Sequence, residues 1–216
     1  MKSDFNIADY AVYLPAINDT YARCLVTEKL GSRPFPAGLD ISDLEFWNED
    51  NKLWHYPYLL HSIGSYKVGS NPDNAVTRAD KNTAVVIGDS GGYQIGQGTL
   101  DGYKNLKPHM PAEDAIIAWR DADEVRSWIF GWLEANSTYA MSIDMPLWAA
   151  EENTKSPFSK CSREQLLQMT VNNLQYIDVR RQGHTNWLNV VQGIDNAATE
   201  QWWSAVKKYR WGGWAL

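Results

Sequence analysis

Short apolar runs alternate with longer amphipathic stretches along most of the chain. The apolar runs have the length and β-branched content of buried strands, and they cover residues 56–60, 83–88, 139–143, 187–191 and 211–216. Between the later runs, apolar residues recur every three or four positions, as they do on one face of a helix. Strands that alternate with amphipathic helices predict a parallel sheet with crossover helices.

Three amphipathic helices are predicted between the later strands. The first has an apolar stripe over residues 118–132, and the third has one over residues 198–209. The second opens at Ser162, which stands at capping-box spacing from Gln165 and turns Leu167, Val171 and Leu174 inward. About five strand–helix units of this kind build part of a (β/α)₈ TIM-type barrel, so an incomplete barrel is expected. Spacing leaves an open doubly wound sheet as the alternative.

Composition places the chain among globular proteins, with 44% hydrophobic and 21% charged residues in 216. Residues 1–55 are turn-rich and predict an irregular N-terminal segment packed on the barrel, and residues 56–216 form the N-terminal part of that barrel. The first residues, with the acidic Asp4 and no apolar run, are not expected to form a secretory signal, and the sequence has no apolar run that could span a membrane. Cys24 and Cys161 are expected to be free thiols in a reducing cytoplasm.

The net charge of -6 is unevenly distributed along the chain. Residues 160–216 hold seven Lys and Arg against four Asp and Glu, whereas the preceding residues are strongly acidic. Basic residues flanking a site could contact nucleic-acid phosphates, and the candidates are Arg180, Arg181, Lys207, Lys208 and Arg210. Ordinary surface charge explains the same distribution equally well.

Polar residues and glycines stand at the ends of four successive predicted strands. They are Asp89-Ser90-Gly91-Gly92, then Asp144, then Gln192-Gly193, and finally Gly212-Gly213. Any one of them could be a helix cap or a turn. In a barrel, however, the carboxyl ends of the strands converge on one face, where such enzymes hold their substrates. The series therefore predicts a binding site at that face.

These segments resemble the tRNA-guanine transglycosylases and their DNA-modifying relatives over residues 83–216. Asp89-Ser90-Gly91-Gly92-Tyr93-Gln94 is similar to the family's Asp-Ser-Gly-Gly-Phe-Gln, and Asp144 matches its next strand-end aspartate. Val190-Val191-Gln192-Gly193 and Gly212-Gly213-Trp214-Ala215 match the family's Val-Gln-Gly and Gly-Gly-Leu-Ala segments. The family exchanges a guanine in nucleic acid for a 7-deazaguanine base, as in queuosine-related modification, without ATP.

The resemblance implies a role for each strand-end residue. Asp144 would bind the N1 and N2 donors of guanine, while Gln192 and the Gly213 N–H would bind O6. Tyr93 would stack on the base, and Asp89, with Ser90, would lie near the glycosidic bond and handle a proton. Two further contacts are implied. At Gly193 the backbone would approach the flat base closely, and the Trp214 side chain would lie beside the substituent of the incoming base.

The chain also departs from the family pattern. The family's nucleophilic aspartate and its zinc site lie downstream of the Gly-Gly segment, so both would lie beyond Leu216. We therefore expect no cofactor or metal in this chain, no nucleophile, and a second polypeptide or C-terminal half as partner. Met145-Pro146-Leu147 follows Asp144, and Ile194 follows Gly193, neither as in the tRNA enzymes. These changes favour phage or bacterial relatives that modify DNA, with tRNA as the alternative.

Two other function classes stay open. One is a non-catalytic purine-binding subunit of a split enzyme. The other is an unrelated barrel lyase or isomerase in which Asp89 and Asp144 form an acid–base pair. The four histidines show no metal-ligand spacing, so they are expected to be packing or surface residues: His55, His61, His109 and His184.

Overall fold

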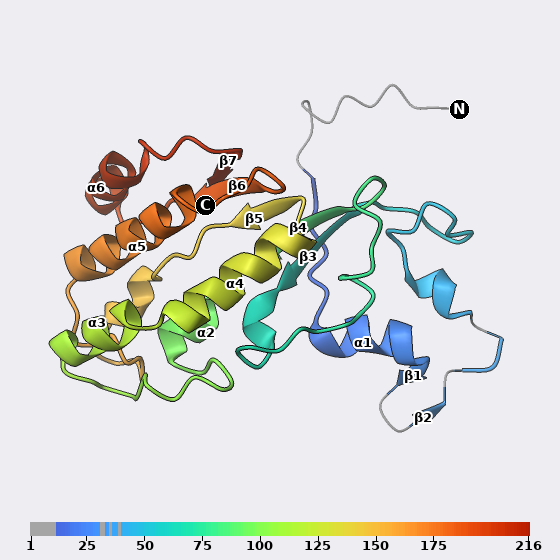
Figure 1. Ribbon diagram of the computed structural model, residues 1–216, viewed down its shortest axis with the longest axis horizontal. Coiled ribbons are helices and arrows are strands. Elements are labelled where there is room, and N and C mark those ends of the chain that lie inside the picture. Colours follow the sequence, from blue (N-terminus) through green and yellow to red (C-terminus); the bar gives the residue numbers. More distant parts are fainter. Residues whose placement is uncertain (1–11, 31–32, 35, 39) are drawn as a thin grey trace.

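A five-stranded parallel sheet forms the centre of the computed structural model, which describes residues 12–30, 33–34, 36–38 and 40–216 (Figure 1). The strands lie in the order in which they occur along the chain, and every neighbouring pair is parallel. They are β3 (Tyr58–Ser62), β4 (Val85–Asp89), β5 (Tyr139–Met141), β6 (Asn186–Val190) and β7 (Gly213–Ala215). The predicted α/β class is confirmed, and each strand overlaps the apolar run that predicted it.

Helices alternate with these strands. The longer ones are α1 (Asp19–Thr27), α3 (Ala112–Arg120), α4 (Asp123–Asn136), α5 (Arg163–Asp178) and α6 (Asn196–Val206), and the shorter ones are α2 (Gly92–Gln97), η2 (Ile41–Leu44), η3 (Ile63–Ser65) and η4 (Leu147–Ala150). A small antiparallel pair, β1 (Lys29–Leu30) and β2 (Arg33–Pro34), follows α1. Within the described ranges, no helix is long and apolar enough to cross a membrane.

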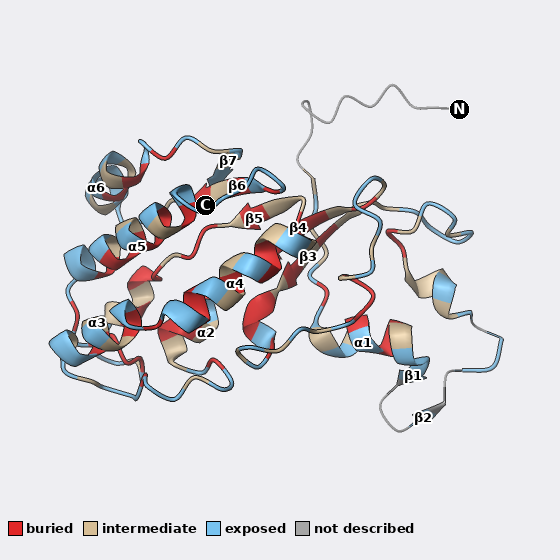
Figure 2. Ribbon diagram, in the orientation of Figure 1, coloured by how far each residue is buried: buried red, intermediate tan, exposed pale blue. Residues whose placement is uncertain are grey.

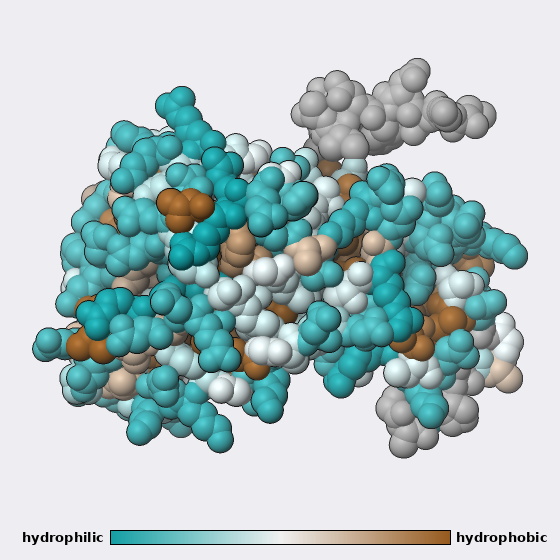
Figure 3. All heavy atoms as spheres, in the orientation of Figure 1, coloured by the Kyte–Doolittle hydropathy of each residue, from teal (hydrophilic) through white to brown (hydrophobic). Residues whose placement is uncertain are grey.

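Helices α4, α5 and α6 cover the same face of the sheet. Gly88 of β4 faces α4, because a Cβ on this glycine would lie 2.6 Å from the side chain of Leu133. On that face, the Asn189 amide donates to the carbonyl of Val206 in α6 at 3.0 Å. Figure 1 shows α5 lying between α4 and α6, and Figure 2 shows buried residues along one side of α4 and α5. The solvent side of this layer is mainly hydrophilic (Figure 3).

The opposite face of the sheet is apolar and only partly buried. It carries the alternate residues of the strands, which include Tyr58, Leu60, Val85, Tyr139, Met141, Leu188 and Val190. A doubly wound sheet reverses its strand order at a switch point and has helices on both faces. Strands in chain order with helices on one face are instead compatible with part of an α/β barrel, whose interior such apolar residues fill.

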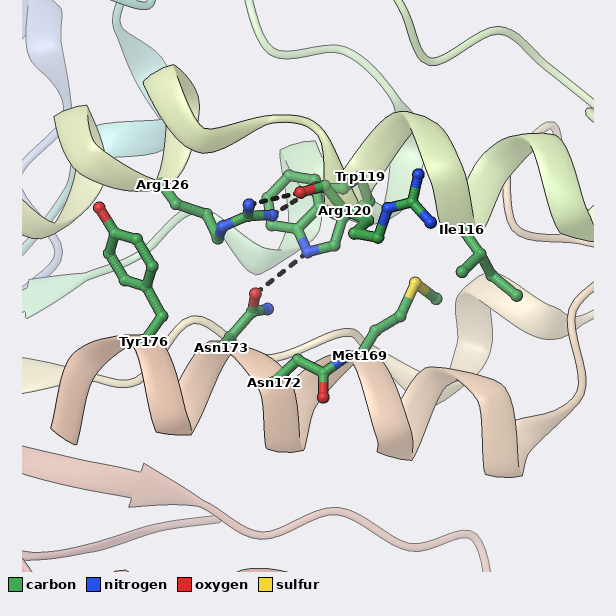
Figure 4. A pocket seen from close by; sticks show the side chains of 8 residues that line it. All are labelled: Ile116, Trp119, Arg120, Arg126, Met169, Asn172, Asn173 and Tyr176. Atoms are coloured by element: carbon green, nitrogen blue, oxygen red, sulfur yellow. Dashed lines mark hydrogen bonds between the residues drawn. The ribbon is translucent and has the colours of Figure 1, made fainter. Parts of the chain in front are cut away.

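The single helix predicted across residues 118–132 is wrong, because α3 ends at Arg120 and α4 begins at Asp123. Arg126 of α4 reaches back across the break, and its guanidinium donates to the carbonyl oxygens of Trp119 and Arg120. The Trp119 carbonyl also accepts from the N–H of Ala122 at 3.1 Å, so Arg126 adds a second bond there and a side-chain bond at the Arg120 carbonyl. Arg126 lines a cavity of about 150 Å³ that lies outside the predicted site, and Figure 4 shows the side chains around it.

The expectation of an irregular segment over residues 1–55 is corrected in its described part, which contains α1. Asn18 begins this helix, since its side chain accepts a hydrogen bond from the N–H of Tyr21 at 2.8 Å. Just before α1, the N–H of Ile17 donates to the carbonyl of Leu60 at 2.8 Å, and the N–H of Leu60 donates to that of Pro15 at 2.9 Å. This parallel bridge extends the sheet beyond β3.

The turn after β4 depends on two glycines that touch. Gly91 has a φ of 81°, in the left-handed region that favours glycine. A Cβ on Gly91 would lie 2.6 Å from the Cα of Gly64, which follows β3. The turn that carries Asp89 and Ser90 therefore packs backbone against backbone on the neighbouring strand end.

Replacing Gly91 by alanine should destabilise the fold. The variant Gly91→Ala combines a left-handed conformation with a backbone clash, so we expect a loss of at least about 2 kcal/mol in the free energy of unfolding. The control is Gly131→Ala on α4, where a Cβ would meet nothing within 4 Å. That change should add about 0.5–1 kcal/mol through helix propensity. Denaturant unfolding measures both, and equal stability of Gly91→Ala and the unchanged protein would contradict the close approach.

Candidate functional site

Three of the predicted side chains meet at the carboxyl edge of the sheet. Asp89 is the last residue of β4, Asp144 follows the end of β5, and Gln192 follows the end of β6. The Gln192 amide N–H donates to Asp144 Oδ2, and the Gln192 Oε1 accepts from the backbone N–H of Leu147 at 2.8 Å. Because the Leu147 N–H can only donate, the oxygen of the Gln192 amide must face Leu147, and the NH₂ group of the same amide then faces Asp144.

The carboxyl group of Asp144 is the most perturbed acid of the site. Burial is the main cause, and the nearby carboxylate of Asp89 adds to it, so that the pKa of Asp144 is raised to about 7. The hydrogen bond from Gln192 acts in the opposite direction, since it favours the charged form. Gly92 leaves room beside this group, because a Cβ there would lie 3.3 Å from Asp144 Oδ1. Asp144 therefore gains or loses its proton near neutral pH.

Two aromatic side chains contact each other near this pair, since Tyr93 follows Gly92 and Trp148 lines a cavity with Gln192. Tyr93 is 64% exposed, and its ring centroid lies 5.5 Å from that of Trp148 at an interplanar angle of 43°. The Trp148 ring is seated on Gly96, where a Cβ would approach it to 2.9 Å. A cavity of about 450 Å³ opens beside Gln192, with Trp148 and Ile194 in its wall. Sequence reasoning missed Trp148, although its closeness to Asp144 in the chain could have indicated it.

The structure gives Ser90 another role than the predicted contact with substrate. Its side chain is fully buried, and its hydroxyl donates to the carbonyl of Ser142 at 3.0 Å. The Ser142 hydroxyl in turn accepts from the N–H of Val190 at 3.2 Å. These two serines link the ends of β4, β5 and β6, and so they brace the residues that carry Asp89, Asp144 and Gln192 rather than reach a ligand.

The predicted contacts at Gly213 and Trp214 are corrected by the register of β7. Gly213 begins this strand instead of following it, and it pairs with Leu188 in the middle of β6. Trp214 pairs with Asn189 on the helix-covered face, where its ring lies 4.5 Å from that of Trp203 in α6. The sequence placed the glycine pair at a strand end because glycines often stop strands. Here a Cβ on Gly212 would lie 2.8 Å from that of Asn186, so close approach requires the glycine.

The packing of α6 explains why position 193 is a glycine. A Cβ on this glycine would lie 1.9 Å from the hydroxyl of Thr199 in the first turn of α6. The missing side chain therefore lets the end of β6 pack against α6, and the predicted close approach of a ligand is not needed to explain it. Gln192, rather than Gly193, carries the polar chemistry at the end of β6.

The family's zinc site finds no counterpart among the residues that the structure describes. No group of three or more His, Cys, Asp or Glu in those ranges could hold a metal ion. Cys24 lies on α1 and Cys161 precedes α5, and both are buried free thiols. His61 is buried as a packing residue, since its ring nitrogens bond to the Ile17 carbonyl at 2.6 Å and the Tyr66 hydroxyl at 2.8 Å.

The raised pKa of Asp144 predicts a pH-dependent stability. A carboxyl whose folded pKa lies above its unfolded value stabilises the fold below about pH 4, and this contribution is lost as the pH rises through about 7. The protein should therefore lose on the order of 4 kcal/mol of its free energy of unfolding between these pH values, and Asp144→Asn should abolish this loss. The control is the exposed Asp50, whose change Asp50→Asn should leave the profile unchanged. Denaturant unfolding across pH 4–8 is the measurement, and parallel profiles for Asp144→Asn and the unchanged protein would contradict it.

No protein-family model matches the chain, and no curated protein matches it. The resemblance to the guanine transglycosylases therefore rests on the strand-end motifs alone. Of these motifs, the segments with Asp89, Asp144 and Gln192 come together at one edge of the sheet, whereas Gly213, Trp214 and Ala215 of the Gly-Gly segment form β7 itself.

Proposed function

We propose that this site binds the Watson–Crick edge of guanine or a 7-deazaguanine. The observation that carries the proposal is the fixed pair of Asp144 and Gln192, which sets a carboxylate acceptor next to an amide donor. Guanine presents the complementary order, with N1–H and N2–H donors beside the O6 acceptor. Asp144 would accept from N1 and N2, and Gln192 would donate to O6.

Tyr93 and Trp148 would supply the stacking surface for the base. Their rings stand beside the polar pair and are tilted by 43°, so a flat ligand can contact either ring once the exposed Tyr93 rotates. Adenine offers a lone pair at N1 where guanine has a proton, so it would face the Asp144 carboxylate unfavourably. Asp144 and Gln192 would thus select guanine over adenine by their hydrogen bonds, and the two rings would add stacking that both purines share.

The resemblance extends the proposal from binding to base exchange in DNA. In this reaction the bond from the sugar C1′ to guanine N9 breaks, and a bond from C1′ to the incoming deazaguanine forms. The proton that the incoming base loses balances the one that the leaving guanine gains. Asp89 would handle this proton, because it ends β4 beside Asp144. The same proposal places the nucleophile on a second polypeptide or on further chain beyond Leu216.

The fold part of the proposal is an (β/α)₈ barrel of which this chain forms several units. Strands in chain order, helices on one face and partly buried apolar residues on the other all support it. In a barrel the base must leave the nucleic-acid stack to reach a pocket at the strand ends. A cytoplasmic setting agrees with the two buried free thiols, Cys24 and Cys161.

Guanine binding tests the central contact directly. Calorimetry at pH 8 should show binding of guanine and much weaker binding of adenine. Asp144→Asn should cost about 1–3 kcal/mol of guanine affinity, because it replaces an acceptor by an amide N–H. The unchanged protein should bind guanine more tightly at pH 8 than at pH 6, since Asp144 must be ionised to accept both protons. Asp50→Asn is the matched control, and unchanged affinity in Asp144→Asn would remove Asp144 from the site.

Base exchange separates the polymers. Labelled guanine would be offered with duplex DNA, single-stranded DNA and tRNA in parallel, using the chain together with its co-purified partner. We expect incorporation into DNA and little into tRNA. The predicted phosphate contacts at the site are not supported by position, because each basic candidate lies between the end of a helix and the start of the next strand, at the amino edge of the sheet and away from the site: Arg180, Arg181, Lys207, Lys208 and Arg210. Incorporation into tRNA alone would overturn the DNA assignment, and guanine binding without exchange would favour a non-catalytic subunit.

A further inference from the structure

Helix α5 turns two polar side chains into the apolar layer that covers the sheet. Thr170 is 0% exposed and Asn173 is 1% exposed. The Thr170 hydroxyl accepts from the backbone N–H of Met145 at 2.9 Å, and the Asn173 amide donates to the carbonyl of Ile143 at 3.0 Å. Both contacts fall on the residues that flank Asp144.

The backbone around Asp144 needs such partners because it has left the sheet. Strand β5 ends at Met141, and the N–H of Ser142 still donates to Leu188 of β6 at 2.8 Å. Beyond that point the Ile143 carbonyl and the Met145 N–H are buried polar groups whose partners are side chains of α5. An unpaired buried group would be costly, so these bonds decide how the segment runs.

The two bonds act on both peptide groups that are attached to the Cα of Asp144. The Ile143 carbonyl belongs to the peptide plane before this Cα, and the Met145 N–H belongs to the plane after it. Holding both planes fixes the φ and ψ angles of Asp144, and with them the direction of its Cα–Cβ bond. The contacts from α5 therefore aim the carboxyl group without touching it.

Asn173 is itself held in a single amide orientation. Its Oδ1 accepts from the indole N–H of Trp119 in α3 at 3.2 Å, a bond that Figure 4 shows as a dashed line. Since the indole N–H is a donor only, the Asn173 NH₂ group must point toward the Ile143 carbonyl. The chain of contacts thus runs from α3 through α5 to the segment that carries Asp144.

We infer that Thr170 and Asn173 are positioning residues for the base-binding carboxylate of Asp144. The inference deepens the proposed function, and the part of it that concerns guanine binding rests on that function. Geometrically it stands on the paired contacts to both neighbours of Asp144. Misplacement of a binding group by a fraction of an ångström is enough to weaken a directional hydrogen bond. The role of α5 in the site is then orientation rather than contact with the ligand.

The test compares two buried threonines. Thr170→Val removes the acceptor for the Met145 N–H while nearly keeping the side-chain shape, and Thr170→Ser restores the hydroxyl. The control is Thr185→Val, because Thr185 is also buried and its hydroxyl donates to the Ser137 carbonyl at 2.6 Å, before β5 begins. The readouts are the dissociation constant of guanine by calorimetry and the titration of the Asp144 carboxyl by carbon NMR. Thermal unfolding confirms that each variant folds, and Thr170→Ala replaces Thr170→Val should the latter not fold.

The expected result is specific to Thr170. Guanine should bind about tenfold more weakly to Thr170→Val, whereas Thr170→Ser and Thr185→Val should stay within about twofold of the unchanged protein. The Asp144 titration should move away from its value near 7 in Thr170→Val only. An equal loss in Thr185→Val, or an unmoved Asp144 titration in Thr170→Val, would overturn the inference. If the unchanged protein does not bind guanine, the proposed function fails, and the Asp144 titration still decides the positioning role.

Discussion

The parallel register of β4, β5 and β6 is the constraint on which the rest of the site depends. Parallel strands bring their carboxyl ends to one edge, so residues far apart in the chain become neighbours there. Two serines connect these strands where the backbone hydrogen bonds of the sheet end. The Ser90 hydroxyl donates to the Ser142 carbonyl, and the Val190 N–H donates to the Ser142 hydroxyl. A shift of register by one residue would turn Asp89 to the helix-covered face and separate it from Asp144.

Much of the sheet could be predicted from the sequence, because its strands are short apolar runs with polar ends. The same reasoning located Asp89, Asp144 and Gln192 at one edge, where the structure has them. It failed at β7, because a Gly-Gly pair is compatible with both the start and the end of a strand. It also merged α3 and α4, since an apolar stripe continues across a break that a side chain from the next helix stabilises.

Buried polar residues were the hardest part to predict. Thr170 and Asn173 lie on the same face of α5 as the buried Leu166, but a polar side chain is normally assigned to solvent. Their partners are backbone groups of a distant segment, which no local pattern in the sequence identifies. Trp148 was missed for a related reason, because its place beside Tyr93 depends on the room left by Gly96 of α2. Tertiary contacts of this kind carry the orientation of the site.

Gln192 and Asp144 share a hydrogen bond that a ligand of the proposed site would have to replace. Gln192 donates to Asp144, so a base that enters between them breaks this bond and must offer a donor to the carboxylate and an acceptor to the amide together. A ligand with only one of these groups would leave a buried partner unpaired, which costs more than the single new bond returns. Protonation of Asp144 changes the balance further, because the neutral acid has a proton to donate and one acceptor fewer. Under the proposed function, selectivity for a guanine-like edge would follow from the hydrogen bond between Gln192 and Asp144.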